Sequence, residues 1–204
     1  MAEYKYKYPN GKGLWFTSDS HFEHANIIKY CNRPFKDVNE MRKKIIENWN
    51  SVVGENDTVF ILGDIGFGPI EQIIENVKQL NGKKILIPGN HDRGYIGKPE
   101  FDELFEEIVP QIYMKIEKKR IYLNHLPFLA FDGAYLGKDA TWQLFGHCHS
   151  FPGSLGLDVQ RLVHLFPTQY DVGMDNNHYT PVSFEQVKEI INNQQESLNL
   201  IRQC

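Results

Sequence analysis

The sequence "LFGHCHS" (residues 144–150) places two histidines one residue apart, directly after an apolar run. In an extended chain alternate side chains share a face, so His147 and His149 can serve one site while Cys148 points away. A zinc finger, a redox pair and a buried polar cluster all remain open for this stretch alone. The chain has three cysteines at wide spacing and no CxxC pair, which excludes a zinc site built on thiolates.

The composition is that of a globular protein with a sizeable core. The chain has 204 residues, of which 41% are hydrophobic and 24% charged, so we expect a single domain over residues 1–204. No apolar run is long enough to cross a membrane, and the first residues lack the apolar segment of a signal peptide. We therefore expect a cytoplasmic protein without a membrane partner.

The charge distribution gives no strong sign of duplex nucleic-acid binding. The net charge is −4, and the basic residues occur in short scattered groups rather than in one long track. Such groups are more often solvated faces than binding surfaces.

Upstream of the opening motif, strand-like runs alternate with helical patterns. The runs "LWFTSD", "TVFILGD" and "KKILIPGNHD" are apolar and end in polar residues, which is typical of strands covered on both faces. Between them, residues 39–53 and 69–80 have helical spacing of apolar residues, with Asn39 and Pro69 near the two starts. This alternation predicts a layered α/β fold with helices outside.

The second half of the chain is richer in strands. The sequence "IVPQIYMKIEKKRIYLNH" predicts a hairpin that turns near Lys118 and Lys119, and "TQYDVGMD" predicts a later strand. A last helix begins after Ser183, because Gln186 three residues later completes a capping-box pattern.

Each predicted strand ends in side chains that can bind a metal ion. Any one of them has an ordinary explanation, as a helix cap, a turn residue or a buried histidine with a partner. Together, at the carboxyl ends of successive strands, they indicate a shared site, because buried carboxylates and imidazoles without a cation are costly. The residues are Asp19 and His21, Asp64, Asn90 with His91 and Asp92, His125, and His147 with His149.

The ordered set "DSH", "GD", "GNHD", a lone histidine and "GHCH" resembles the calcineurin-like metallophosphoesterase superfamily. The stretches "DSHFEHANIIKYCNRPF" and "VGMDNNHYTPVSFEQV" are similar to a group of small bacterial and phage phosphoesterases. This resemblance implies an α/β fold with four layers, an α/β/β/α sandwich of two mixed sheets flanked by helices.

The resemblance also implies a centre with two divalent metal ions. Asp64 would be shared between the two ions, and Cys148 need not be a ligand. The mixed nitrogen and oxygen donors favour manganese, with iron or zinc as alternatives. The first ion would be held by Asp19, His21, Asp64 and His149, and the second by Asp64, Asn90, His125 and His147.

The chemistry implied is hydrolysis of phosphate esters. A hydroxide bridging the two ions would attack phosphorus, and His91 would protonate the leaving alkoxide as general acid. Asp92 either orients His91 or caps the following turn. The substrate would be a small phosphodiester or a nucleotide, with a diester favoured over a monoester. Because ligand histidines must be neutral, we expect activity to fall below about pH 6.

Two residues near the first motif are candidates for binding the substrate. Arg33 fits a phosphate clamp, or alternatively marks a simple turn before Pro34. His24 would contact the substrate or cap a helix. The segment Ser150–Pro167 is rich in Gly and Pro and predicts either a flap over the cleft or a contact in a homo-oligomer.

Two other functions stay open. A metal-dependent nuclease would use the same centre, although the chain lacks a basic stripe and an additional DNA-binding domain. A catalytically silent scaffold of the same fold is the second alternative, and it conflicts with the full set of ligands and with His91. The sequence "GDIGFGP" continues with neutral residues, which argues against protein-serine/threonine phosphatase activity.

Overall fold

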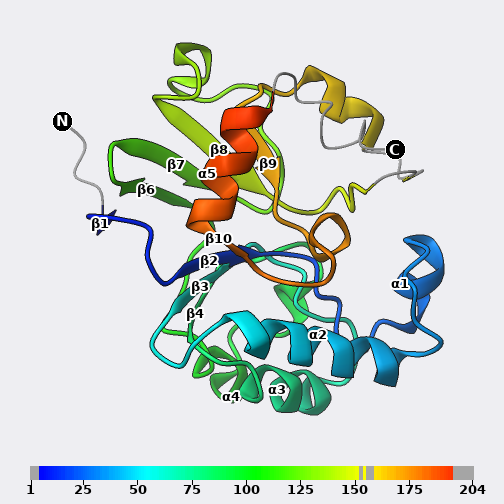
Figure 1. Cartoon of the computed structure of the whole chain (residues 1–204). Coiled ribbons are helices and arrows are strands. Elements are labelled where there is room, and N and C mark those ends of the chain that lie inside the picture. Colours follow the sequence, from blue (N-terminus) through cyan, green and yellow to red (C-terminus); the bar gives the residue numbers. More distant parts are fainter. Residues whose placement is uncertain (1–4, 152–153, 155–158, 195–204) are drawn as a thin grey trace.

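The computed structural model describes residues 5–151, 154 and 159–194, and its core is formed by two five-stranded sheets packed face to face (Figure 1). Both sheets contain parallel and antiparallel neighbours, and helices flank them. This confirms the predicted α/β class with two mixed sheets. Within the described residues, no helix has the length and apolar character that a membrane span needs.

The first sheet contains the strands predicted from the first half of the chain. Its central strands are parallel, and a short antiparallel strand from the end of the chain closes one edge. In hydrogen-bonded order the strands are β10 (Val182–Ser183), β2 (Leu14–Thr17), β3 (Thr58–Ile61), β4 (Lys83–Leu86) and β5 (Glu107–Ile108).

The second sheet contains the predicted hairpin. Ile116 pairs with Lys119 in antiparallel register, so the chain turns at the two residues between them, which confirms the expected position. The next strands along the sheet are parallel to the second strand of the hairpin. In hydrogen-bonded order the strands are β1 (Tyr6–Tyr8), β6 (Ile112–Ile116), β7 (Lys119–Leu123), β8 (Thr141–Phe145) and β9 (Gln169–Asp171).

The helices agree with the predicted segments, except for one cap. The long helix begins after Asp37, whose carboxylate accepts a hydrogen bond from the Glu40 amide at 2.9 Å, so Asn39 is not its cap. The last helix has the expected capping box of Ser183 and Gln186. The α-helices are α1 (Ala25–Tyr30), α2 (Val38–Val52), α3 (Ile70–Lys78), α4 (Pro99–Asp102) and α5 (Phe184–Asn193), and the 3₁₀ turns are η1 (Asp92–Gly94), η2 (Ala134–Leu136), η3 (Val159–His164) and η4 (Met174–Asn177).

The first sheet has an apolar core on each face. Phe16 and Phe60 stack at 5.5 Å between their ring centroids and face the second sheet, together with buried residues of β6, β7 and β8. Val59 and Ile61 point the other way, toward the layer that α2, α3 and α4 form under this sheet (Figure 1). The first sheet is therefore covered on both faces, as the continuous apolar runs predict.

The outer face of the second sheet has a different cover. Tyr113 and Tyr122 stack at 4.4 Å there, and Phe128 and Phe131 contact Tyr122 edge-on. These two phenylalanines lie in the connection between β7 and β8. Among the described residues, a loop with the short turn η2 thus covers this face, while α5 packs beside β9, β10 and β2.

The carboxyl ends of both sets of parallel strands meet at one place. Ser18, just after β2, forms an isolated bridge with Gly173, just after β9, and the Met174 amide donates to the Ser18 carbonyl at 2.9 Å. The Gly146 amide after β8 donates to the His125 carbonyl after β7 at 3.0 Å. The two sheets therefore deliver their strand-end loops to a common edge, where ligand sites of α/β proteins are found.

Candidate metal centre

All seven residues predicted as metal ligands lie together at this edge. Each follows the carboxyl end of a strand, and their side chains form two neighbouring groups in which the candidate ligand atoms lie within 4.8 Å of one another. Asn90 joins the second group, since its Oδ1 lies 3.1 Å from Nε2 of His125. The first group is Asp19, His21 and His149, and the second is Asp64, His125 and His147.

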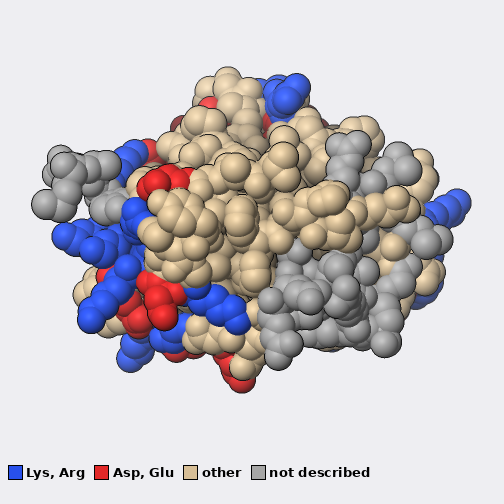
Figure 2. Space-filling view, turned by 90° about the horizontal axis from the view of Figure 1, so that it is seen from above, with Lys and Arg blue, Asp and Glu red and all other residues tan. Residues whose placement is uncertain are grey.

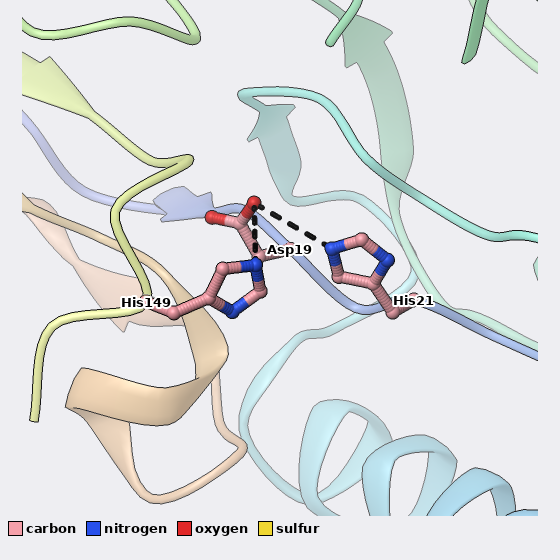
Figure 3. A group of neighbouring side chains, drawn as sticks. All are labelled: Asp19, His21 and His149. Carbon is pink, nitrogen blue, oxygen red and sulfur yellow. Dashed lines mark ion pairs between the residues drawn. The ribbon is translucent and has the colours of Figure 1, made fainter. Parts of the chain in front are cut away.

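The first group contains two deeply buried residues and a partly exposed one, His149, and its candidate ligand atoms point toward one another (Figure 3). Oδ1 of Asp19 lies 4.0 Å from Nε2 of His21 and 3.9 Å from Nε2 of His149, and Asp19 and His21 are 0% and 1% exposed. Within the described part of the chain, Asp19 Oδ1 and His21 Nε2 have no hydrogen-bond partner. A buried polar atom without a partner is costly, and a cation between these atoms would satisfy both.

Asp64 lies between the two groups. Its Oδ2 is 3.5 Å from Nε2 of His125 on one side and 3.7 Å from Nε2 of His21 on the other. Its other oxygen, Oδ1, accepts a hydrogen bond from the His91 amide at 2.8 Å, which fixes the carboxylate plane. One oxygen is thus anchored to the backbone while the other faces both sets of imidazoles.

The backbone at the site adopts conformations that L-residues rarely use. Positive φ angles of non-glycine residues cost free energy and often occur at functional sites, because the surrounding structure must hold them. Here the positive φ angles lie directly after the strands, where the chain leaves the strand direction and the side chains point into the centre. The candidate ligands concerned are Asp19 (φ 59°), His21 (φ 50°), Asp64 (φ 53°), His147 (φ 68°) and His149 (φ 47°).

Two glycines of the motifs allow the loops to approach the carboxylates. A Cβ at Gly146 would lie 2.5 Å from Oδ2 of Asp19, and one at Gly89 would lie 2.2 Å from Oδ1 of Asp64. Both distances are too short for real atoms. The glycine before each ligand motif is therefore required by close packing against the opposite loop.

The protonation behaviour of the histidines reflects this crowding of charge. Burial lowers the pKa of His21 well below its ordinary value, and the neighbouring His149 and Arg33 act in the same direction. Burial also disfavours the charged form of His125, but its contact with the Asp64 carboxylate outweighs this and raises the pKa to about 9. In the metal-free protein, a proton on His125 thus offsets part of the negative charge that a cation would neutralise.

Comparisons with known proteins agree with this geometry. A sequence profile of the family described as Calcineurin-like phosphoesterase matches residues 13–163, a range that contains all the motifs from Asp19 to His149. The chain belongs to the calcineurin-like phosphoesterase family. It is thus related to metal-dependent hydrolases of phosphate esters.

Several relatives align over most of their length. The uncharacterized protein MJ1445 of Methanocaldococcus jannaschii is 34% identical over 180 residues, which is 87% of this chain and 90% of that protein. The Gene 66 protein of Mycobacterium phage D29 is 28% identical, covering 91% of this chain and 98% of its own length. The solved structure of AQ665 from Aquifex aeolicus, a protein of unknown function, superimposes with a TM-score of 0.66 at 25% identity, over 87% of this chain and 98% of that one.

In this phosphoesterase, Arg33 does not fit the role of phosphate clamp. Its buried guanidinium donates two hydrogen bonds of 2.8 Å to the Asp175 carboxylate, one of 2.8 Å to the Asp19 carbonyl and one of 3.1 Å to the Ser20 carbonyl. No donor is left to face a substrate, so the prediction for Arg33 is corrected. Arg33 instead ties the loop after β2 to the turn η4.

Asp175 is a functional residue that the sequence reasoning missed. Its Oδ2 lies 2.7 Å from Nδ1 of His149, so this carboxylate orients the imidazole whose Nε2 faces Asp19. Burial raises the pKa of Asp175, but the Arg33 guanidinium and the contact with His149 outweigh this and hold it below its ordinary value. A carboxylate behind a ligand histidine is the usual support of a metal site.

The two residues after Asn90 have separate positions. His91 is 34% exposed, and its Nε2 lies 3.9 Å from Oδ2 of Asp64, so the ring borders the centre and reaches solvent. Asp92 is buried, and its carboxylate accepts hydrogen bonds from the amides of Asp64, Ile65 and Gly89 at 2.7–3.0 Å. The predictions for Asp92, a catalytic or orienting role beside His91 or a cap of the following turn, are therefore corrected. Its carboxylate instead links the loops after β3 and β4.

His24 lies at the rim of the centre. It occupies the N-cap position of α1 without making a side-chain cap bond, so the capping alternative is not seen. Its Nδ1 is 3.2 Å from Nδ1 of His21, and its ring packs at 4.8 Å against Phe67. His24 thus contacts a metal-ligand candidate on one side and Phe67 on the other, and it is partly exposed.

The centre opens into neighbouring cavities. A cleft of about 310 Å³ is lined by members of both groups and by two neighbouring rings: His149 of the first group, Asp64, Asn90 and His147 of the second, and His91 and Tyr30. A second cavity of about 650 Å³ shares Asn90, His125 and His147 with the centre and includes Arg93. Within the segment Ser150–Pro167, residues 152–153 and 155–158 lie outside the described residues, and the predicted role of the segment as a flap or oligomer contact stays a prediction.

Proposed function

We propose that this protein is a dinuclear metal-dependent phosphoesterase. The observation that carries the proposal is the position of Asp64 between two clusters of ligand atoms, one of which contains buried polar atoms without partners. One ion would be bound by Asp19, His21, Asp64 and His149, and the other by Asp64, Asn90, His125 and His147.

The donor set fits divalent transition metals. Imidazole nitrogens, two carboxylates and one amide oxygen, with no thiolate, suit manganese first and iron or zinc as alternatives. When bound, such a pair of ions supplies Lewis acidity toward a phosphoryl oxygen and lowers the pKa of water. Since only two of the seven ligand residues are acidic, the centre retains positive charge that favours an anionic phosphate.

His91 is the proposed general acid. Its side chain borders Asp64 and lines the cleft, while its backbone amide is held by the same carboxylate. These contacts support a position of the ring beside the reacting phosphate, with its exposed edge left unused. From there His91 can donate a proton to the leaving oxygen, a role that requires hydrogen-bond reach to that atom.

Arg93 replaces Arg33 as the cation proposed to bind the substrate. It is exposed, lines the cavity next to Asn90 and His125, and makes no ion pair with another described residue. A guanidinium without a partner can bind a phosphate oxygen in bidentate fashion. We infer a small phosphodiester or nucleotide as substrate, and a cytoplasmic location stays a prediction.

A metal-dependent nuclease is the alternative within the same chemistry. Figure 2 shows one face of the molecule, on which Lys and Arg gather mainly at one side and are mixed with Asp and Glu. The described residues of this face form no continuous basic track such as a duplex backbone requires. The net charge of −4 and the scattered basic groups of the sequence also favour the small substrate.

Turnover of model esters tests the proposal. The apoprotein is loaded with manganese, iron or zinc and assayed on bis(p-nitrophenyl) phosphate and p-nitrophenyl phosphate. We expect hydrolysis that prefers the diester, that His91→Gln abolishes, and that His178→Gln, at an exposed histidine outside the centre, leaves unchanged. No turnover by any metal form would contradict the proposal and favour the scaffold.

A further inference from the structure

An aromatic side chain with unusual exposure stands beside the proposed general acid. Phe67 is 51% exposed, and its ring packs edge-on against His91 at 5.2 Å between centroids and against His24 at 4.8 Å. A phenylalanine half in water leaves apolar surface unused, although β3 and α3, which flank its loop, both contribute to the core.

Hydrogen bonds fix the backbone on both sides of Phe67. Its amide donates to the Phe22 carbonyl at 2.8 Å, and Phe22 forms a bridge with Gly66 directly before it. Directly after it, the hydroxyl of Tyr95 accepts from the Gly68 amide at 2.8 Å and lies 3.0 Å from the Gly68 carbonyl. The loop is therefore fixed on both sides of the exposed ring, which is how a binding surface is kept ready for its ligand.

A second exposed aromatic ring lies near His91, on the far side of His24 from Phe67. Tyr30, at the end of α1, is 74% exposed and lines the cleft together with His91. Its ring centroid lies 6.3 Å from that of His24. His24 thus lies between Tyr30 and Phe67, and the three rings form a continuous aromatic surface next to His91.

The three rings lie on the His91 side of the centre, and this position determines which part of a substrate they can contact. In hydrolysis of a phosphate ester the general acid protonates the leaving oxygen, so the group attached to that oxygen must lie next to His91. We propose that Phe67, with His24 and Tyr30, forms a stacking surface for a nucleobase carried by the leaving alcohol of the substrate. The inference rests on the proposed function and adds to it a substrate class, namely a phosphate ester of a nucleoside.

Stacking explains why rings line this side. Every base has a flat π-face, so aromatic side chains bind bases without specific hydrogen bonds, and one such contact changes affinity by about 5- to 150-fold. Because Phe67 is only half exposed, we expect about tenfold for its contribution.

Binding of two phosphonates that cannot be hydrolysed tests this inference independently of catalysis. The manganese-loaded full chain is titrated calorimetrically with the 5′-methylenephosphonate of adenosine and with that of ribose, which lacks the base. We expect the adenosine compound to bind about tenfold more tightly. Phe67→Ala should remove most of this difference, whereas Phe67→Tyr should keep it.

Tyr135→Ala is the matched control. Tyr135 is also strongly exposed, but it lies on η2, near the start of β8 and so at the far end of that strand from the ligand histidines. Its removal should leave both affinities unchanged.

Equal affinity for the two phosphonates, or an unchanged ratio in Phe67→Ala, would overturn the stacking surface. Hydrolysis of model esters by the same preparation would then still support the proposed function. Conversely, base-dependent binding without turnover would retain the surface and refute the phosphoesterase activity.

Discussion

The two halves of the centre are enclosed to different degrees. Asp19 and His21 are almost fully buried, and His149 is held from behind by Asp175. On the other side His125 is buried and His147, like His149, is partly buried, but Asn90 is exposed and lines both open cavities. From the exposure of Asn90 we expect the first half to retain its proposed ion more firmly and the second half to be open to the substrate.

The strongest test of this comparison removes the residue that both halves share. We expect Asp64→Asn to lower turnover by at least about 1,000-fold, because the amide keeps the shape and loses the charge between the two ions. Elemental analysis should show fewer than two bound ions. Asp139→Asn, at an exposed position, is the control, and retained turnover in Asp64→Asn would contradict the shared role.

The next largest effect is expected from replacing His91, which should lower the rate of hydrolysis without changing metal binding. His91→Gln should reduce kcat by about 100- to 10,000-fold, the range of a lost general acid. Its metal content should stay unchanged, because the backbone amide that holds Asp64 is kept. A variant that loses ions together with activity would show that His91 is a ligand instead.

Loss of the Asp175 carboxylate, which contacts His149, should affect metal binding only in the first half of the centre. Asp175→Asn is expected to lower the affinity for one of the two ions by about 10- to 100-fold, since it removes the negative charge behind His149. The Arg33 guanidinium then loses its buried counter-charge, so the melting temperature should fall as well. A chelator titration that still removes both ions as in the unmodified protein would refute this role.

The pH dependence of metal binding follows from the raised pKa of His125. In the metal-free protein this pKa is about 9, so the proton on His125 stabilises the fold fully below the ordinary value near 6.5, and this contribution is lost as the pH rises through about 9. The metal needs the neutral imidazole, so its affinity should rise over the same range, by up to about tenfold per pH unit.

Calorimetry in buffers of different ionisation enthalpy measures the protons released when manganese binds. We expect release near neutral pH and less of it above about pH 9, where His125 of the metal-free protein is already neutral. Binding without any release would show that the centre is deprotonated before the metal arrives.

The smallest effect is expected at the rim of the open half. Arg93→Ala should raise KM about two- to tenfold and leave kcat nearly unchanged, because an exposed cation binds ground state and transition state alike. Arg93→Lys should fall between, since lysine lacks the bidentate geometry. A loss in kcat instead would indicate contact with the reacting atoms.

The sequence predicted the parts of the site that are encoded locally. Apolar runs ending in His, Asp or Asn define strand tips, and tips of parallel strands meet at one edge of a sheet, so residues such as Asp64 and His147 could be expected together. The capping box at Ser183 was equally local. The cap of α2 was missed by two residues because Asp37 and Asn39 are both good caps.

Contacts between segments that are far apart in the chain could not be predicted from the sequence. Arg33 looked like a free phosphate ligand because its partner, Asp175, is 142 residues away. Asp175 itself follows a strand end, β9, so the rule that found the other ligands could have included it. Phe67 gave no signal, since only the fixed loop shows that its ring stays exposed.

The most direct test of the account is the position of the ions themselves. Crystals of the manganese-loaded protein should show two anomalous scattering peaks about 3.5–4 Å apart, on either side of the Asp64 carboxylate. A single peak, or two peaks that do not share Asp64, would contradict the account.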